Sequence, residues 1–320
     1  KRLGGLQVAR FLARNHPRIL MYHRISPDGA PGTISVDQFR EQIRLIKRSF
    51  EPISLTKLVK LYDQGIRPNH AVAVTFDDGY KDFAEYAFPI LKEEGVPATL
   101  FVTTGFVNGE TWLWPDQIRY LLKRINHNEL LSLCFEEVNL KNNSDPDFTW
   151  QVLANYCLSL EDERKNEFID ELFKNFNIVK PGKAPPEYEA VSWEKINDMV
   201  GCGLELGCHS HTHPVLKNVH DKELYREIFL SKKILENNIG MEVSSFCYPN
   251  GQIDDFDERV KVEVKNAGYK FGVSAYPSTN PLKDCWAIGR YPGANERDNF
   301  EKILFGFVYL KNLFFCRVEV

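Results

Sequence analysis

The sequence lacks several features that would place a protein in a class at once. Its 320 residues contain no uninterrupted apolar run of about 18 residues, so we expect no membrane-spanning helix. No secretory signal opens the chain, which starts at Lys1 rather than at a methionine, as it would if an upstream segment had been removed. The net charge is close to balance, at −4, and this argues against a nucleic-acid-binding protein.

Cysteine is present, but not in a pattern that would build a framework. The seven cysteines are an odd number without a Cys-x-x-Cys pair, and the closest two, Cys202 and Cys208, are six residues apart. We therefore expect neither a disulfide framework nor a structural zinc site. Free thiols favour a reducing compartment. The expected location is the cytoplasm, with an exported protein as the alternative if a signal has been removed.

Both ends of the chain combine apolar and basic residues. Residues 1–17 predict an amphipathic helix that lies either on a membrane or, as we favour, on the protein's own surface. Residues 300–320 predict an apolar helix that packs on the protein or faces a membrane, although the end of this segment could equally form a strand. Peripheral association with the inner membrane face is therefore one expectation, whereas the sequence predicts no oligomeric state.

Short apolar runs alternate with amphipathic segments along the chain. Seven runs predict strands, at residues 18–23, 71–76, 98–104, 203–209, 244–249, 269–275 and 285–292. Helical periodicity appears between them, at residues 35–48, 54–65, 82–94, 221–239 and 256–267. This alternation predicts an α/β fold with a parallel sheet of about seven strands. Residues 110–190 break the alternation and predict a mostly helical insertion.

Two adjacent acids follow the strand predicted at 71–76. Asp77 and Asp78 repel each other and resist burial, and Gly79 lets the backbone turn sharply after them. A solvated turn between strand and helix would explain these residues without any function. However, functional groups gather at the carboxyl ends of parallel strands, so a role in a site is the alternative.

Three of the eight histidines fall within five residues, directly after another predicted strand. If this segment turns helically, His209 and His213 share a face and His211 points elsewhere; if it is extended, all three share a face. The spacing leaves both arrangements open. Two imidazoles and one carboxylate would form a metal site with open positions, and the cation would offset the repulsion between Asp77 and Asp78. The second carboxylate would lie near metal-bound water, as metal-assisted hydrolysis requires.

These two segments together resemble the motifs of a known family. TFDDGY (75–80) and HSHTHP (209–214) are similar to the polysaccharide deacetylases, the NodB homology family also called carbohydrate esterase family 4. Five further segments resemble its branch with an early Tyr-His motif, namely LMYHRI (20–25), GVPATLFVTTGF (95–106), FCYPNG (246–251), AGYKFGVS (267–274) and GRYP (289–292). The resemblance implies a distorted (β/α) barrel, commonly of seven strands. We expect this catalytic domain over residues 18–299, with the insertion at about 110–190.

The resemblance also implies roles for individual residues. Asp77 corresponds to the general base. Asp78, His209 and His213 correspond to the ligands of a divalent metal ion, usually Zn²⁺ and sometimes Co²⁺ or another ion. His211 falls on a variable position of the motif and receives no role.

The third motif of the family often reads Arg-x-Pro-Tyr-Gly, and this chain departs from it twice. Cys247 replaces the Arg that orients the base, and we expect Arg290 to substitute for it, unless Arg290 only pairs with a surface acid. Asn250 replaces the Tyr whose backbone N–H contacts the oxyanion, a role that does not depend on the side chain. Many relatives use a late histidine as general acid, but none follows His220 here. We therefore expect His23 to be the general acid, with a buried structural histidine as the alternative.

The expected activity is metal-dependent removal of an N-acetyl group from an amino sugar in a polysaccharide, an oligosaccharide or a lipid-linked glycan. The alternatives are a deformylase acting on a lipid-linked sugar, a catalytically silent glycan-binding module on the same fold, and a structural membrane-associated protein that binds no metal. Trp112 and Trp114 are expected either to stack on sugar rings or to anchor the insertion.

Overall fold

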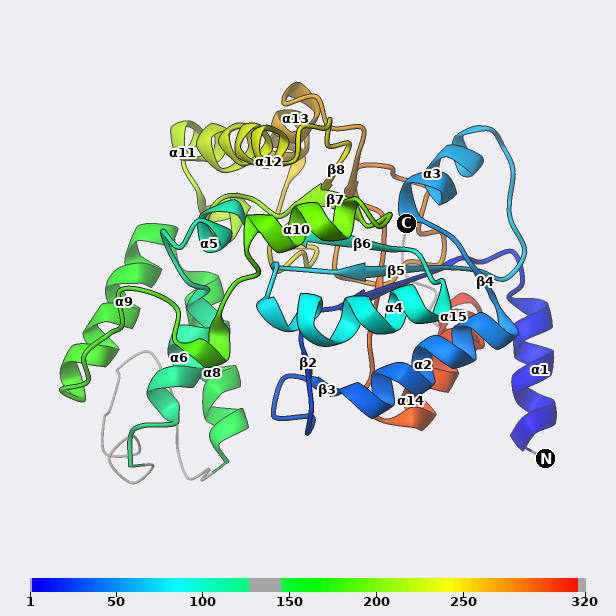
Figure 1. The fold of residues 1–320 in the computed structure, drawn as a ribbon, viewed down its shortest axis with the longest axis horizontal. Coiled ribbons are helices and arrows are strands. Elements are labelled where there is room, and N and C mark those ends of the chain that lie inside the picture. Colours follow the sequence, from blue (N-terminus) through cyan, green and yellow to red (C-terminus); the bar gives the residue numbers. More distant parts are fainter. Residues whose placement is uncertain (1, 127–144, 316–320) are drawn as a thin grey trace.

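The computed structural model describes residues 2–126 and 145–315. Within these residues, seven strands form a parallel sheet in the order β10-β1-β5-β6-β7-β8-β9 (Figure 1). They are β1 (Arg18–Tyr22), β5 (Ala71–Phe76), β6 (Ala98–Val102), β7 (Glu205–Cys208), β8 (Ser245–Cys247), β9 (Phe271–Val273) and β10 (Tyr291–Pro292). A short strand, β4 (Glu51–Pro52), pairs with the start of β5, and β2 (Ile25–Ser26) pairs with β3 (Ile34–Ser35) in a separate ribbon.

The sheet curls into a distorted barrel. The segment that precedes β10 closes the gap between the two edges of the sheet. Its Ile288 forms an isolated parallel bridge with Val273 of β9, and β10 itself pairs with β1. The predicted α/β barrel of about seven strands is therefore confirmed. The last predicted strand, 285–292, is mostly irregular, since only its final residues enter the sheet as β10.

Helices surround the sheet (Figure 1). Those of the barrel are α2 (Val36–Ser49), α3 (Leu55–Asp63), η1 (Phe83–Ala87), α4 (Phe88–Glu94), α5 (Thr104–Val107), α10 (Trp193–Val200), η3 (Leu216–Asn218), α11 (Asp221–Tyr225), η4 (Arg226–Leu230), α12 (Ser231–Ile239), α13 (Glu258–Asn266) and α14 (Arg297–Leu304). Helices α2 and α3 are each capped by a serine: the side chains of Ser35 and Ser54 accept a hydrogen bond from a backbone N–H in the first turn of α2 and α3, respectively. The helix predicted at 221–239 is interrupted by the wider turn η4.

Side-chain alternation along the strands separates two apolar cores. In β5, Val72, Val74 and Phe76 face outward into the main core beneath the helices, whereas Ala71 and Ala73 face the barrel interior. The interior cluster also contains Phe101 of β6. Because side chains alternate with a period of two, this pattern decides which residues after each strand point into the barrel.

The segment expected to form an insertion holds α6 (Trp114–Leu122), α8 (Pro146–Ser159), α9 (Asp162–Asn175) and η2 (Pro186–Tyr188). These helices lie on one side of the barrel (green in Figure 1) and share a core of their own, which includes Ile118, Leu153 and Phe168. Residues 127–144 of the expected insertion lie outside the described residues. The exit of the segment rejoins the barrel at Ala190, which forms an antiparallel bridge with Tyr80.

The first and last helices of the described residues lie side by side, away from the insertion (Figure 1). Helix α1 (Arg2–Leu12) contacts α15 (Phe307–Phe315), and both helices leave apolar side chains exposed, among them Phe11 and Phe314. Each helix within the described residues is too short or too polar to cross a membrane. The expectation that the C-terminal end could form a strand concerns residues 316–320, which lie outside the described residues.

Candidate active site

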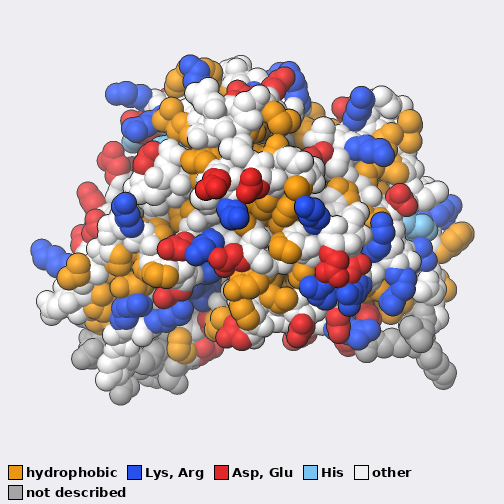
Figure 2. Space-filling model, viewed as in Figure 1, with side chains coloured by type: hydrophobic (Ala, Val, Ile, Leu, Met, Phe, Trp, Pro, Cys, Tyr) orange, Lys and Arg blue, Asp and Glu red, His pale blue; other side chains and the backbone are white. Residues whose placement is uncertain are grey.

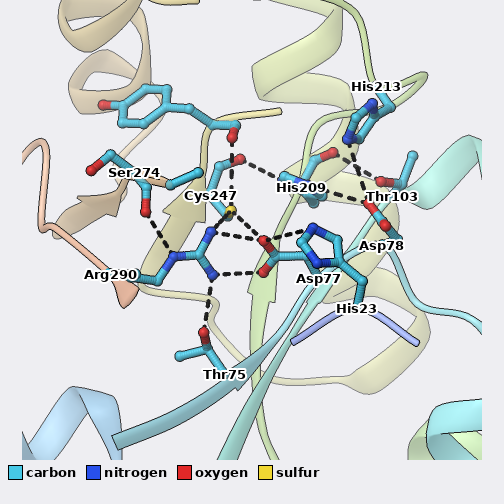
Figure 3. Close-up of polar contacts among 12 residues, drawn as sticks. His23, Thr75, Asp77, Asp78, Thr103, His209, His213, Cys247, Ser274 and Arg290 are labelled. Carbon is cyan, nitrogen blue, oxygen red and sulfur yellow. Dashed lines mark hydrogen bonds and ion pairs between the residues drawn. The ribbon is translucent and has the colours of Figure 1, made fainter. Parts of the chain in front are cut away.

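The site forms where the barrel interior opens at the carboxyl ends of the strands. The inward alternation of Ala71 and Ala73 continues through Thr75 to Asp77. The same alternation carries Ile288 of the interior cluster to Arg290. Residues from distant parts of the sequence therefore meet at one end of the barrel, as Figure 3 shows.

The acidic turn after β5 is held by backbone hydrogen bonds. The N–H of Asp77 donates to the carbonyl of Tyr22 on β1 at 3.0 Å, and the N–H of Thr103 donates to the carbonyl of Asp78 at 3.1 Å. Asp78 and Gly79 both have positive φ, at 75° and 91°. This reversal turns Asp78 toward the histidines while Asp77 keeps its inward direction. Both carboxylates are buried, so the solvated turn considered as an alternative is wrong.

The histidine segment is neither helical nor extended. Ser210 and His213 adopt left-handed φ values of 62° and 63°, which bring the rings of His209 and His213 together at 4.9 Å between centroids. Ser210 Oγ accepts a hydrogen bond from the N–H of His213 at 3.0 Å, which supports the turn. His211 points away from this pair: its Nδ1 lies 2.9 Å from Thr104 Oγ1. The arrangement with three histidines on one face is therefore wrong.

Asp78, His209 and His213 form a ligand set that fits a divalent cation. The ligand atoms of all three lie within 4.8 Å of one another. Asp78 Oδ1 is 3.4 Å from Nε2 of both histidines, yet this buried oxygen has no hydrogen-bond partner among the described residues. Buried carboxylate oxygens without partners are costly, and a cation between the three groups would satisfy this one.

The protonation of the histidines also suits metal binding. His209 Nδ1 donates to the carbonyl of Cys247 at 2.8 Å, which leaves Nε2 as the nitrogen that faces Asp78. Burial lowers the pKa of His213 to about 3, so its imidazole is neutral. Burial also lowers the pKa of His209, but Cys247 and Asp78 raise it more, so a cation bound there would displace a proton.

Arg290 holds Asp77 in a two-pronged ion pair. Its Nη1 and Nη2 each donate to one carboxylate oxygen of Asp77 at 2.7 Å, and both side chains are buried. Arg290 also donates to the carbonyl of Ser274 at 2.8 Å and to Thr75 Oγ1 at 3.0 Å, which fixes the guanidinium plane. The surface-acid alternative for Arg290 is therefore wrong. Burial raises the pKa of Asp77, but Arg290 lowers it by more, so the carboxyl remains ionised at neutral pH.

His23 and Cys247 complete the surroundings of Asp77. His23 Nε2 lies 3.9 Å from Asp77 Oδ2, and the side chain is 46% exposed, so the buried structural alternative for His23 is wrong. Cys247, where the family motif has an Arg, donates its thiol to Asp77 Oδ2 at 3.6 Å and lies 3.1 Å from Arg290 Nη2. The guanidinium thus reaches Asp77 from the residue that precedes β10 instead of from β8.

Three other residues considered from the sequence make no contact with the two aspartates among the described residues. Asn250 adopts a φ of 59° in the turn after β8, and no contact found among the described residues joins it to Asp77 or Asp78. Trp112 and Trp114 are 3% and 5% exposed, and Trp112 Nε1 donates to the carbonyl of Pro181. These two rings are therefore packed inside the protein and are not available to stack on a sugar.

One supporting residue was not predicted. Glu227, on η4, accepts hydrogen bonds from the backbone N–H groups of His211 and Thr212 at 2.9 and 2.8 Å, and from Thr212 Oγ1 at 2.7 Å. Glu227 therefore stabilises the histidine loop, although it belongs to a helix that comes later in the sequence. A single acid in a charged helix carries no signal that would have pointed to this contact.

The open end of the parallel barrel thus combines a carboxylate–imidazole set that could hold a cation with a separate, arginine-bound carboxylate, and metal-assisted hydrolysis needs both. The family model for polysaccharide deacetylases matches residues 64–155 and 164–272. The chain belongs to this family of enzymes, as its motifs suggested.

Individual proteins agree with this assignment. A poly-beta-1,6-N-acetyl-D-glucosamine N-deacetylase of Staphylococcus aureus (strain MSSA476) is 28% identical over 209 residues, which cover 65% of this chain and 71% of that protein. Among solved structures, IcaB from Ammonifex degensii aligns with a TM-score of 0.60 at 17% identity, over 90% of this chain and 95% of that chain. The Streptococcus pyogenes deacetylase PplD, in complex with acetate, aligns with a TM-score of 0.57 at 17% identity, over 87% and 92%. These two structures support the fold.

Proposed function

We propose that this protein is a metal-dependent N-deacetylase that removes acetyl groups from amino sugars of a polysaccharide, an oligosaccharide or a lipid-linked glycan. The proposal rests mainly on the different surroundings of the two adjacent aspartates. Asp78 faces two imidazoles in a set suited to a cation, whereas Asp77 is held by Arg290. The presence of both a ligand set and a base favours an active enzyme over a silent glycan-binding module. The similarity to a poly-N-acetylglucosamine deacetylase favours an N-acetylated glycan as substrate.

Asp78, His209 and His213 would hold the ion, for which we propose Zn²⁺, with Co²⁺ or another divalent ion as alternatives. When bound, the ion supplies a Lewis acid that polarises the amide carbonyl and makes water a better nucleophile. Asp77 accepts the proton of the attacking water, and the Arg290 fork keeps its carboxylate ionised and oriented. His23 donates a proton to the departing amine. Water and the amide thus become acetate and a free amino sugar, with the Asn250 backbone N–H as our proposed donor to the substrate oxygen.

The test measures metal content and acetate release from N-acetylglucosamine oligomers. We expect the metal-loaded wild type to release acetate and Asp77→Asn to keep its metal while losing at least about 100-fold in kcat. Failure of the wild type with Zn²⁺, Co²⁺ and other divalent ions, or full activity of Asp77→Asn, would contradict the proposal. Formylated amino sugars in the same assay distinguish a deformylase, which would prefer them to the acetylated ones.

The role of His23 has its own test. His23→Gln should lower kcat on the amide by about 10²–10⁴-fold, the range typical of a lost general acid. An activated aryl acetate has a leaving group that needs no proton, so its hydrolysis should fall far less. The matched control is His220→Gln, since His220 is exposed and lies outside the site. An equal loss on both substrates would show that His23 does not act as the acid.

We also propose that the protein works at a membrane surface, on the cytoplasmic side. Helices α1 and α15 contact each other and expose four apolar side chains, Val8, Phe11, Leu313 and Phe314. The guanidinium of Arg14 lies 4.6 Å from the ring centroid of Phe11. Apolar side chains next to basic groups suit the interface of an anionic lipid layer. This placement would suit a lipid-linked glycan.

A further inference from the structure

A groove of about 520 Å³ lies next to the metal ligands but not over them. Its walls come from the helical insertion (α6, α8 and η2) on one side and from η1 and the β2–β3 ribbon on the other. The volume is within the range of roughly 300–1,000 Å³ that is typical of small-molecule sites. None of Asp77, Asp78, His209 and His213 is among the described residues that line it. The groove therefore needs an explanation other than the metal site itself.

The groove and the active site share two chain segments. Arg24 lines the groove and directly follows His23, while Lys81 and Asp82 line it and follow the acidic turn. Lys81 is three residues after Asp78, so their Cα atoms are at most about 11 Å apart. This separation is short enough for a glycan whose reacting unit lies at Asp78 to reach the groove with further units.

Most of the charged residues that line the groove are paired, although its six acids outnumber its four bases. Three ion pairs connect residues that line it, namely Arg24–Asp82 at 2.8 Å, Lys81–Glu189 at 2.8 Å and Arg119–Asp147 at 3.2 Å. Acidic and basic side chains are correspondingly interspersed on the face shown in Figure 2. Paired charges still exchange hydrogen bonds with hydroxyl and amide groups, but they offer little attraction to a ligand of either sign. The lining therefore disfavours an anionic ligand and suits a polar one without negative charge.

Two half-buried aromatic rings line the groove, one from each wall. Trp150 projects from α8 of the insertion, where its Nε1 donates to the carbonyl of Pro115 at 3.0 Å and the Arg119 guanidinium lies 4.0 Å from its ring centroid. Tyr86 belongs to η1 on the barrel side. Sugar rings combine apolar C–H faces with hydroxyl edges, so they match a lining of aromatic rings and paired polar groups.

We propose that this groove binds additional, uncharged N-acylated amino-sugar units of a glycan whose reacting unit lies at Asp78, His209 and His213. The inference rests on the proposed deacetylase function and adds to it a preference for long chains. The insertion then supplies one wall of a site for the glycan chain, in addition to its own core.

The first test compares kinetics on N-acetylglucosamine oligomers from the dimer to the hexamer. Trp150→Ala should raise KM for the hexamer about tenfold and leave KM for the dimer unchanged, as expected when one aromatic contact to distant units is lost. Phe148→Ala is the matched control, because Phe148 is an exposed aromatic on the same helix that does not line the groove. Since Trp150 also packs on the insertion core, Tyr86→Ala provides an independent variant with the same expected effect.

The second test separates the groove from the chemistry. Binding of the hexamer to the inactive Asp77→Asn protein is measured by calorimetry, with and without Trp150→Ala or Tyr86→Ala. Weaker hexamer binding in both double variants supports the groove even if the wild type releases no acetate, an outcome in which only the proposed activity fails. Equal hexamer affinity with and without the groove substitutions, or no hexamer binding at all, overturns the inference.

Discussion

The ion pair between Arg290 and Asp77 offers the sharpest single test of the site. In Arg290→Gln the buried carboxylate of Asp77 loses two charge-assisted hydrogen bonds of 2.7 Å. Each such bond contributes about 1.5–3 kcal/mol, and breaking a buried pair on one side typically costs about 3–5 kcal/mol. We therefore expect the free energy of unfolding to fall by about 3–5 kcal/mol at neutral pH, a large part of the roughly 5–15 kcal/mol of an ordinary domain.

The pH dependence follows from the pKa of Asp77. Burial raises this pKa, but Arg290 lowers it more, so the pKa of Asp77 is lower in the folded than in the unfolded protein. Ionised Asp77 therefore stabilises the fold above the unfolded pKa of about 4, and this stabilisation disappears as the pH falls through the folded pKa. In Arg290→Gln burial is opposed only by the smaller effects of His209 and His23, so the pKa of Asp77 rises. The stability difference between wild type and variant should then be largest at neutral pH and shrink toward about pH 4, and the acidic limb of the activity profile should move to higher pH.

Urea unfolding monitored at several pH values measures this effect, with acetate release followed in parallel. Arg290→Lys keeps the charge but not the two-pronged geometry, so it should recover part of the stability and little of the activity. Arg44→Gln is the control, because Arg44 pairs with Glu94 at the surface. Adding Arg290→Gln to the Asp77→Asn variant should lower the free energy of unfolding much less than adding it to the wild type. Additive losses in this double-mutant cycle would refute the pairing as the source of the effect.

Three further predictions concern other parts of the molecule. His213→Ala should abolish stoichiometric metal binding measured by elemental analysis, whereas His211→Ala should retain it; equal metal content in both would contradict the assigned ligand set. Burial raises the pKa of Asp116 to about 6, so this group removes stability as the pH rises from about 4 to about 6, and Asp116→Asn should flatten that part of the stability profile measured by thermal unfolding. Replacing Phe11 and Phe314 by Asp should reduce sedimentation with anionic vesicles, while unchanged sedimentation would argue against membrane contact through α1 and α15.

Much of the fold could be predicted because buried parallel strands carry a strong local signal. β5 and β6 are continuous apolar runs, and β5 is followed by the helical segment of η1 and α4, which buries Phe83, Ile90 and Leu91. The inward direction of Asp77 also follows from the alternation that starts at Ala71. The pairing of Arg290 with Asp77 was expected from the family resemblance, since the chain lacks the motif arginine at Cys247.

The arrangement of the histidine loop could not be predicted from spacing. Neither a helix nor a strand describes it, because Ser210 and His213 adopt positive φ, a conformation that non-glycine residues rarely adopt. Glu227 stabilises this backbone from a later helix, and such a long-range contact leaves no periodic pattern in the sequence. The burial of Trp112 likewise depends on the packing of the insertion against the barrel, which the sequence of the segment does not encode locally.

The return of the insertion to the barrel has a consequence for protein engineering. The N–H of Val191 donates to the carbonyl of Gly79 and the N–H of Lys81 donates to the carbonyl of Glu189, both at 2.9 Å, on either side of the bridge between Tyr80 and Ala190. The last residues of the inserted segment thus hold the backbone that follows Asp77 and Asp78 in place through hydrogen bonds. A chimera that exchanges the helices for those of a relative should therefore place its junction before residue 189, so that the transplanted segment changes the groove and leaves the catalytic turn supported.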